Sequence, residues 1–427
     1  RSIQSNMMAI FTDCPDREKR GWLGDTAVVL GSITRNYDVA AYLRNVSRNM
    51  ADSQTAEGLV PTFVPAFYRF TGPLGDDPNW GNAIALIPWH LYQTYGDVET
   101  LRTYYPNMRR YLDYLSGNAN GYILSTGLGD WEWPTRVTPD PSVAPGVTST
   151  YGYYRLALTL SRIAAVLGHY DDAANDAALA ASIGDSFNAH FLDRTNHTYL
   201  NGQQAADALA LDMGIVPEDQ RQAVLDHLVA GIRSAGNHAT VGIIGLQALL
   251  RVLAAAGRDD VIYDIATQTT YPSYGYEVVN GATSLTETWE MDPSASFNHM
   301  MFGSIDEWFT SGLAGIQQAP DSTGYASLVI KPAILDGLTE VHGTYQTPQG
   351  LVSSKWTRDA RGLVRLSIAI PGNTTAAIWV PAAGSSVRHR RPEAPPAPRR
   401  ETGYAVYNIG PGTYNFVIPA LPSGLPR

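Results

Sequence analysis

From Asp13 to Asp25 the chain reads Asp-Cys-Pro-Asp-Arg-Glu-Lys-Arg-Gly-Trp-Leu-Gly-Asp, which concentrates acids, cations and one indole in a short segment. Pro15, Gly21 and Gly24 oppose a continuous helix, so we predict a loop at the end of an element. Carboxylates bind hydroxyl groups and move protons, and an indole face packs against the apolar face of a sugar ring. The segment therefore favours a carbohydrate site over the alternative, a solvated charged turn.

A second segment of the same character lies far downstream, where Glu287 is followed by Trp289 and Glu290 and then by Phe297-Asn298-His299. Hydrolysis of a glycosidic bond needs two carboxyl groups, one that protonates the leaving oxygen and one that attacks the sugar or activates water. Glu18, with three aspartates near it in the first segment, is the candidate acid, and Glu287 is the candidate base. For Glu290 a structural role, as a solvated or salt-bridged neighbour of Glu287, is favoured over a catalytic one.

Several indoles lie in loop-like segments that are rich in Gly, Pro and Asp. Each suits a sugar-binding wall, but each also suits packing beneath the rim of a helical domain, and we expect at least two of the five to do only that. His299 precedes an apolar helical pattern, where a lone histidine is more often structural than functional. The five indoles are Trp22, Trp80, Trp131, Trp133 and Trp289.

Composition narrows the classes of partner. The chain has 427 residues, a formal net charge of −10 and one cysteine, Cys14, which we interpret as a small buried packing residue. An acidic protein does not favour nucleic acid or an anionic membrane, because both attract basic surfaces. Metal-binding His-Glu-x-x-His and Cys-x-x-Cys motifs, phosphate loops and Gly-x-Ser-x-Gly elbows are absent from the sequence. We therefore expect no metal and no cofactor.

The sequence divides into a helical part and a strand-rich part. Apolar residues recur at helical spacing from Leu156 to Leu167 and from Ile243 to Leu253. The loops between the helices carry aromatics and acids, which suggests a toroid of paired helices with a site at one mouth. Beyond about Gln317, short alternating apolar segments predict antiparallel strands, for example at 366–370, 376–380 and 414–418. The Pro- and Arg-rich stretch 387–400 is predicted to be a long loop or an insertion.

The first segment resembles the hallmark loop of the inverting α-L-rhamnosidases, a family built on an (α/α)6 barrel. That loop reads roughly Asp-Cys-Pro-x-Arg-Glu/Asp and then Gly-Trp-x-Gly-Asp. Further segments resemble the family in the same order along the chain: 80–83, 127–131, 271–276, 281–283 leading to Glu287, 297–304 and 330–332. The resemblance implies a mainly α fold, with an (α/α)6 toroid over residues 1–316, whose first helix is truncated, and a small antiparallel β-sandwich over 317–427.

The resemblance also implies roles for individual residues. Glu18 matches the general acid of the family, and Glu287 matches its general base, which activates water. An inverting reaction predicts carboxyl groups roughly 6.5–9.5 Å apart. Residues that line the rhamnose subsite are matched by Asp13, Arg17, Trp22, Asp25, Trp80, Trp131 and His299, and Trp289 joins them as a substrate-binding candidate because it lies beside Glu287.

Two positions depart from the family pattern. Thr286 stands before the candidate base where the family usually has Trp, and Asn82 follows Trp80-Gly81 where the family commonly has Asp. Both changes alter shape or charge near the expected subsites, so they bear on substrate preference.

The sequence therefore predicts a glycoside hydrolase that releases terminal α-L-rhamnose from a glycoside or polysaccharide of plant or microbial origin. Two alternatives stay open: an inverting (α/α)6-barrel glycosidase for another sugar, and a catalytically silent carbohydrate-binding relative. Three N-glycosylation triplets, at Asn45, Asn196 and Asn373, favour a secreted or extracytoplasmic location over the cytoplasm. The sequence sets no oligomeric state.

Overall fold

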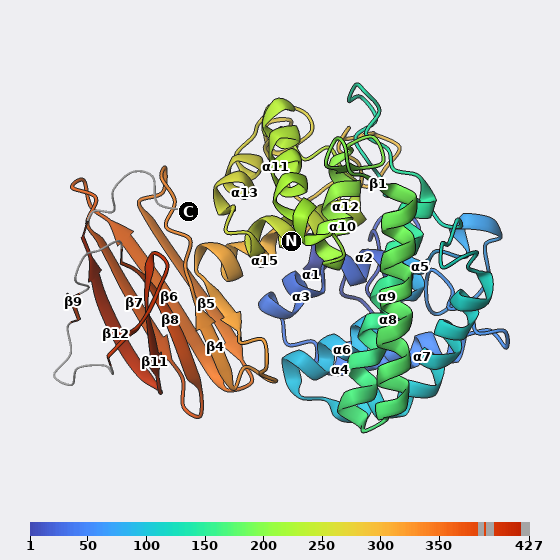
Figure 1. Cartoon of the computed structure of the whole chain (residues 1–427), viewed down its shortest axis with the longest axis horizontal. Helices are drawn as coiled ribbons and strands as arrows, with labels where there is room; N and C mark the ends of the chain where they lie inside the picture. The colour runs from blue at the N-terminus through green and yellow to red at the C-terminus, as the bar shows by residue number, and fades with distance from the viewer. Residues whose placement is uncertain (383–387, 390–396, 420–427) are drawn as a thin grey trace.

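The computed structural model describes residues 1–382, 388–389 and 397–419. A helical domain lies beside a β domain, with the chain passing from one to the other once (Figure 1). Most of the predicted loop 387–400 lies outside the described residues. Two described pieces at its ends form short strands instead, Arg388–His389 and Arg399–Glu401.

The helical domain is built from helices of 4 to 23 residues. Their bounds are α1 Ser2–Asn6, α2 Leu23–Val28, α3 Leu30–Asn36, α4 Ala40–Ser53, α5 Pro78–Gly81, α6 Ala83–Tyr95, α7 Val98–Asn118, α8 Pro145–Leu167, α9 Tyr170–Phe191, α10 Gln204–Met213, α11 Glu218–Ser234, α12 Ile243–Ala255, α13 Asp259–Ala266, α14 Tyr274–Val279 and α15 Ile305–Trp308. Short strands β1 Leu192–Asp193 and β2 Thr198–Tyr199 pair between α9 and α10.

Two long helices show why the predicted spacing produces helices. In α8, Leu156, Leu160 and Ile163 are fully buried on one face, and the helix ends at Gly168, which adopts a left-handed conformation with φ 81°. In α12, the apolar side chains cover most of the circumference and are buried, because this helix lies inside the domain. The helices predicted over 156–167 and 243–253 are therefore confirmed.

The helices form a closed ring. Each helix of the ring contacts the next one, in the order α2 and α3, α6, α8, α10, α12 and α15. The ring closes because α15 contacts α3. Helices α4, α7, α9, α11 and α13 follow members of this ring along the chain and pack against them; α8 and α9 lie side by side in Figure 1. This arrangement confirms the predicted toroid of paired helices, whose core is one continuous apolar cluster.

In its described residues the β domain forms two five-stranded sheets, with strand orders β10-β11-β8-β4-β3 and β5-β6-β7-β12-β9. In β7 the side chains of Val364, Leu366 and Ile368 alternate inward toward a core shared by the two sheets. The strands are β3 Ile316–Gln318, β4 Ser327–Ile330, β5 Glu340–Thr347, β6 Gly350–Arg358, β7 Val364–Ile370, β8 Thr375–Pro381, β9 Arg388–His389, β10 Arg399–Glu401, β11 Tyr404–Ile409 and β12 Gly412–Ile418.

One strand pair departs from the antiparallel arrangement. Strands β4 and β8 pair in parallel, with Ser327 opposite Thr375. Parallel neighbours need a crossover connection, which here is supplied by β5, β6 and β7 in the other sheet. The sandwich is therefore confirmed, with a mixed first sheet in place of a purely antiparallel one.

Candidate active site

A cavity of about 220 Å³ lies at one end of the helical ring. Its walls come from the segments that precede ring helices: 13–22 before α2, Trp80 in α5 before α6, 128–131 before α8, and 287–299 before α15. The lining residues are Asp13, Glu18, Arg20, Trp22, Asp25, Phe70, Leu74, Trp80, Leu128, Trp131, Glu287 and His299. The fold thus gathers at one mouth all the predicted site residues except Arg17 and Trp289, although Arg17 contacts both candidate catalytic acids.

Residues 13–22 of the first segment form a closed loop, as predicted, but the prediction is wrong for Leu23, Gly24 and Asp25, which form the first turn of α2. Asp13 N–H donates to the Arg20 carbonyl at 2.9 Å, and Arg20 N–H donates back to Asp13 Oδ1 at 2.8 Å. Gly21 allows the loop to approach the neighbouring strand-like segment, because a Cβ there would lie 2.2 Å from the Val64 carbonyl oxygen. Cys14 is fully buried and donates to Asp13 Oδ2 at 3.2 Å, so it acts as the predicted small packing residue.

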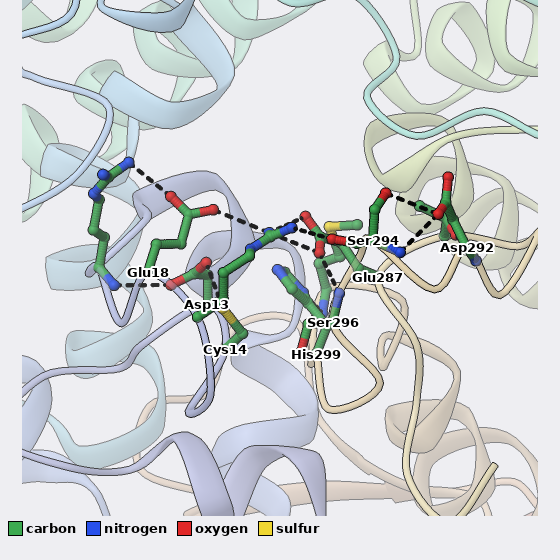
Figure 2. Close-up of polar contacts among 12 residues, drawn as sticks. Asp13, Cys14, Glu18, Glu287, Asp292, Ser294, Ser296 and His299 are labelled. Atoms are coloured by element: carbon green, nitrogen blue, oxygen red, sulfur yellow. Dashed lines mark hydrogen bonds and ion pairs between the residues drawn. The ribbon is translucent and has the colours of Figure 1, made fainter.

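Arg17 links Glu18 to Glu287, which lies 270 residues away from it in the sequence. Its Nη2 donates to both oxygens of Glu287, at 2.7 and 2.8 Å, and to Glu18 Oε1 at 3.1 Å. Figure 2 shows Asp13 and Glu18 on one side of this contact and Glu287, Ser296 and His299 on the other. The nearest oxygens of the two acids are therefore closer than the roughly 6.5 Å lower limit expected between the carboxyl groups of an inverting pair.

The two candidate catalytic carboxylates have different surroundings. Glu287 is 9 % exposed, and its Oε2 accepts from the backbone N–H of Ser296 at 2.7 Å. A second backbone bond, from Glu287 N–H to the Ser296 carbonyl, closes this part of the loop. Glu18 is more open, with 23 % of its side chain exposed against 12 % for the Glu287 side chain, and it accepts from Arg20 Nη1 at 2.7 Å. Arg17 and Arg20 together balance the charge of Glu18.

Burial shapes the electrostatics of the cavity floor. It raises the pKa of Asp13 to about 6, and it raises the pKa of Asp25 well above its ordinary value, with a further contribution from the Asp13 charge. Burial also lowers the pKa of His299 to about 4, so its imidazole is neutral at pH 7. His299 Nε2 lies 3.4 Å from Asp25 Oδ1. The floor therefore presents a neutral imidazole ring and buried carboxyl groups to the cavity.

Three of the five indoles line the cavity. Trp80 is 1 % exposed and lies against Gly24 of α2, while Trp131 is fixed through its carbonyl, which accepts from Ile243 N–H at 2.9 Å. Asp130 holds the same loop onto the start of α12, because its carboxylate accepts from Gly242 N–H at 2.7 Å and from Gly245 N–H at 2.8 Å. Trp22 forms a third wall.

Trp289 does not reach the cavity. Its indole is 1 % exposed, donates to the Val241 carbonyl at 3.1 Å and packs against Phe302 with ring centroids 4.3 Å apart. It is a core residue beneath the loop that carries Glu287, because the burial of its large apolar surface outweighs any gain from facing solvent. Trp133 is also absent from the lining. The expectation that at least two indoles serve packing is met by Trp289 and stays a prediction for a second one.

The two positions that depart from the family pattern are buried away from the cavity. Thr286 is 1 % exposed and donates to the Thr288 carbonyl at 2.9 Å. Asn82 is fully buried at the junction of α5 and α6. Neither side chain lines the cavity, so any influence on substrate preference acts through Trp80 and Glu287, which stand close to them in the chain.

Sequence reasoning missed an acid whose charge interacts with that of Glu287: Glu132, which follows Trp131 in the loop before α8 and does not itself line the cavity. Its backbone adopts the left-handed conformation with φ 60°, which is uncommon outside glycine and often marks a functional segment. Burial raises its pKa to about 7, and Glu287 and Glu290 add to the effect. The run Asp130-Trp131-Glu132-Trp133 was the available signal, but nothing local to it shows that Glu132 and Glu287 lie close together.

Among the described residues, no group of three or more His, Cys, Asp or Glu side chains is arranged to hold a metal ion. In the same part of the chain, no helix has both the length and the apolar character needed to cross a bilayer.

The fold and site place the chain in a known class of protein. Residues 1–313 match the family model described as the bacterial alpha-L-rhamnosidase 6 hairpin glycosidase domain, and residues 315–393 match the bacterial alpha-L-rhamnosidase C-terminal domain. The chain belongs to this family of glycoside hydrolases. This agrees with the resemblance found in the sequence.

Individual relatives support the assignment. An alpha-L-rhamnosidase of Streptomyces avermitilis is 32% identical over 97% of this chain and 40% of its own length, and one of Alteromonas sp. is 29% identical over 89% and 42%. The chain thus spans about two fifths of the length of the curated relatives it matches.

Solved structures of relatives have the same fold. The alpha-L-rhamnosidase from Dictyoglumus thermophilum has a TM-score of 0.90 at 31% identity, covering 97% of this chain and 48% of that one. The Streptomyces avermitilis enzyme, complexed with L-rhamnose, has a TM-score of 0.89 at 32% identity, covering 98% and 40%.

Proposed function

We propose that this chain forms the catalytic part of an α-L-rhamnosidase that removes terminal α-L-rhamnose from a glycoside or polysaccharide with inversion. The observation that carries the proposal is the meeting of Glu18 and Glu287 in one cavity walled by Trp22, Trp80 and Trp131. Membership of the family and the rhamnose-bound Streptomyces avermitilis relative support the choice of sugar.

In this proposal Glu18 donates its proton to the glycosidic oxygen, and Glu287 takes a proton from the attacking water. The bond from the anomeric carbon to the glycosidic oxygen breaks as a new carbon–oxygen bond forms on the opposite face. Backbone N–H of Ser296 orients Glu287 for this step, while Trp80 and Trp131 hold the sugar ring. Asp13, Asp25 and His299 bind sugar hydroxyls from the floor.

Arg17 occupies the space that this reaction needs. Its Nη2 stands between the two carboxylates in the free chain, where a sugar and a water must fit. We propose that Arg17 turns from the carboxylates to the hydroxyls of the bound sugar, which widens the gap toward the roughly 6.5–9.5 Å of an inverting pair. Its side chain is 40% exposed, so this turn needs no unpacking of the core.

The test compares the hydrolysis of 4-nitrophenyl α-L-rhamnoside and methyl α-L-rhamnoside by the wild type, Glu18→Gln and Glu287→Gln. We expect each variant to lose about 10²–10⁴-fold in kcat on at least one substrate. Glu18→Gln should lose more on the methyl glycoside, because methoxide needs protonation more than nitrophenolate does. The kcat of Glu287→Gln should fall by similar factors on the two substrates.

Glu290→Gln is the matched control. Glu290 lies in the same loop as Glu287, but it accepts from Thr135 N–H at 2.7 Å and lies outside the cavity lining. Equal rates for the wild type and Glu18→Gln would overturn the assignment of the acid. Proton NMR of the first-formed rhamnose should show the β-anomer, and an initial α-anomer would exclude inversion.

A panel of other aryl glycosides and a binding titration with rhamnose, added to this assay, separate the two remaining alternatives. Turnover of another aryl glycoside but not of the rhamnoside would show a glycosidase for a different sugar. Binding of rhamnose without turnover of any glycoside in the panel would show a catalytically silent relative.

A further inference from the structure

A cluster of aromatic side chains lies beside the cavity, in the loop between α4 and α5. We name Phe63, Phe67, Tyr68 and Phe70 the aromatic cluster. Tyr68 contacts the other three rings: its ring centroid lies 4.9 Å from that of Phe67, 5.1 Å from that of Phe70 and 5.3 Å from that of Phe63. Most of these pairs are edge-to-face, the arrangement that aromatic rings prefer.

The aromatic cluster is continuous with the cavity. Phe70 lines the cavity and stacks on Trp22, with ring centroids 5.8 Å apart and planes 12° from parallel. Leu74, in the short 3-10 helix Gly72–Leu74 of the same loop, is 39% exposed and also lines the cavity. An apolar surface therefore leads from the cavity wall out to solvent.

Arg20 connects the aromatic cluster to the candidate acid. Its guanidinium lies 5.0 Å from the ring centre of Tyr68 and 5.3 Å from that of Phe70, and its Nη1 donates to Glu18 Oε2 at 2.7 Å. A general acid must contact the leaving-group oxygen, so the group bonded to that oxygen extends on the Glu18 side. This step rests on the proposed function, and it places the leaving group over the aromatic cluster.

The exposure of the aromatic cluster indicates what it binds. Phe63 is 1 % exposed and anchors the loop, whereas Phe67 is 73% exposed. Between positions 63 and 74 the polar side chains are Tyr68, Arg69 and Thr71. A second sugar residue needs several donors and acceptors for its hydroxyls, whereas a flat ring system needs apolar faces with few polar groups.

We propose that the aromatic cluster is a leaving-group subsite that binds a planar aromatic aglycone, with Phe67 and Tyr68 as its outer contact surface. An aromatic pair of this kind contributes about a two- to tenfold change in affinity.

The first test measures binding without catalysis. Isothermal titration with 2-naphthol, which carries no sugar, is run on the wild type, Phe67→Ala and Phe67→Leu. We expect both variants to weaken Kd about two- to tenfold, because leucine keeps apolar bulk but lacks the ring. Tyr170→Ala is the matched control, since Tyr170 has the same 73% exposure on α9 and should leave Kd unchanged. Equal Kd values for the wild type and Phe67→Ala would overturn the subsite.

The second test uses kinetics with two leaving groups on the same sugar. Phe67→Ala should lower kcat/KM for 2-naphthyl α-L-rhamnoside about two- to tenfold more than for a rhamnosyl-glucose disaccharide, chiefly through KM. A larger loss on the disaccharide would assign the aromatic cluster to a carbohydrate instead and reject the aromatic aglycone. If the wild type hydrolyses neither glycoside, the proposed function fails, while the 2-naphthol titration still decides whether the subsite exists.

Discussion

At the scale of single residues, burial changes the pKa of ionisable side chains that line the cavity. Asp13 carries out two tasks at once, because its backbone and carboxylate close the first loop onto Arg20 while its side chain lines the cavity floor. That position costs free energy when the group ionises, which is why its pKa rises to about 6. The ionised carboxylate of Asp13 therefore costs stability at this position.

The raised pKa of Asp13 predicts a pH-dependent effect of Asp13→Asn on stability. An acid whose pKa is higher in the folded state destabilises that state once it ionises, so the penalty grows between about pH 4 and pH 6 and persists above. Asn keeps the acceptor for Arg20 N–H but carries no charge. Thermal denaturation should therefore favour the variant over the wild type more at pH 7.5 than at pH 4, by up to about 3 kcal/mol.

The opposite contribution of His299, whose lowered pKa stabilises the folded state as pH rises through about 4 to 6.5, is common to both proteins and cancels in the difference. Asp113→Asn, at an exposed position of α7, is the control variant. The same offset between Asp13→Asn and the wild type at both pH values would contradict the prediction.

At the scale of elements, the site depends on how closely α2 approaches α5. Gly24 lies in the first turn of α2, and Trp80 lies in α5 beneath it. A Cβ at position 24 would be 2.3 Å from the indole of Trp80, which no native contact tolerates. The close approach brings Asp25 and Trp80 to the same cavity wall.

Gly24→Ala should therefore disturb both the fold and the site. We expect a loss of about 1–3 kcal/mol in the free energy of unfolding, because either the indole or α2 must shift. A rise in KM for the aryl rhamnoside should accompany it, since Trp80 forms the sugar wall in the proposed function. The measurements are urea denaturation and steady-state kinetics.

Gly117→Ala is the comparison, because Gly117 also lies in a helix, α7, and its added Cβ meets nothing within 4 Å. Alanine there should be neutral or stabilising by up to about 1 kcal/mol, as helix propensity predicts. A similar response of the two variants would show that the Gly24–Trp80 contact is not what limits substitution.

At the scale of the whole molecule, the two domains are joined by packing as well as by the chain. Arg35 of α3 has only 7% of its side chain exposed. Its Nη1 donates to the Ile316 carbonyl in β3 at 3.0 Å, and its guanidinium lies 5.2 Å from the ring centre of Tyr345 in β5. Trp356 of β6 adds a bond to the Leu313 carbonyl at 3.2 Å. These contacts thus hold the β domain against the helical ring.

Arg35→Met should weaken this junction. Losing the bond to the Ile316 carbonyl and the contact with Tyr345 should cost about 1–3 kcal/mol, measured by urea denaturation followed by calorimetry for separate domain transitions. Arg44→Met removes an ion pair with Asp97 from a side chain that is 52% exposed, and should cost less than about 1 kcal/mol. Equal losses from the two variants would mean that Arg35 does not couple the domains.

Much of the site could be predicted because its chemistry depends on which types of residue occur and on their order along the chain. The loop from Asp13 to Asp25 and the segment around Glu287 each contain acids, breakers and an indole, and such combinations indicate a site before any geometry is known. The roles of Glu18 and Glu287 remain predictions, to be decided by the variants described above. Trp289 could not be separated from Trp131 in the sequence, because both lie beside acids in loops.

The sequence by itself determined the helical and strand-forming segments, since apolar spacing and breakers act locally, and it determined which residues carry carboxylates and indoles. Tertiary structure alone decided that Trp131 faces the cavity while Trp289 bonds the Val241 carbonyl, that β4 pairs in parallel with β8, and that Arg17 reaches Glu287. These outcomes depend on contacts between distant segments, whose energies no local pattern contains.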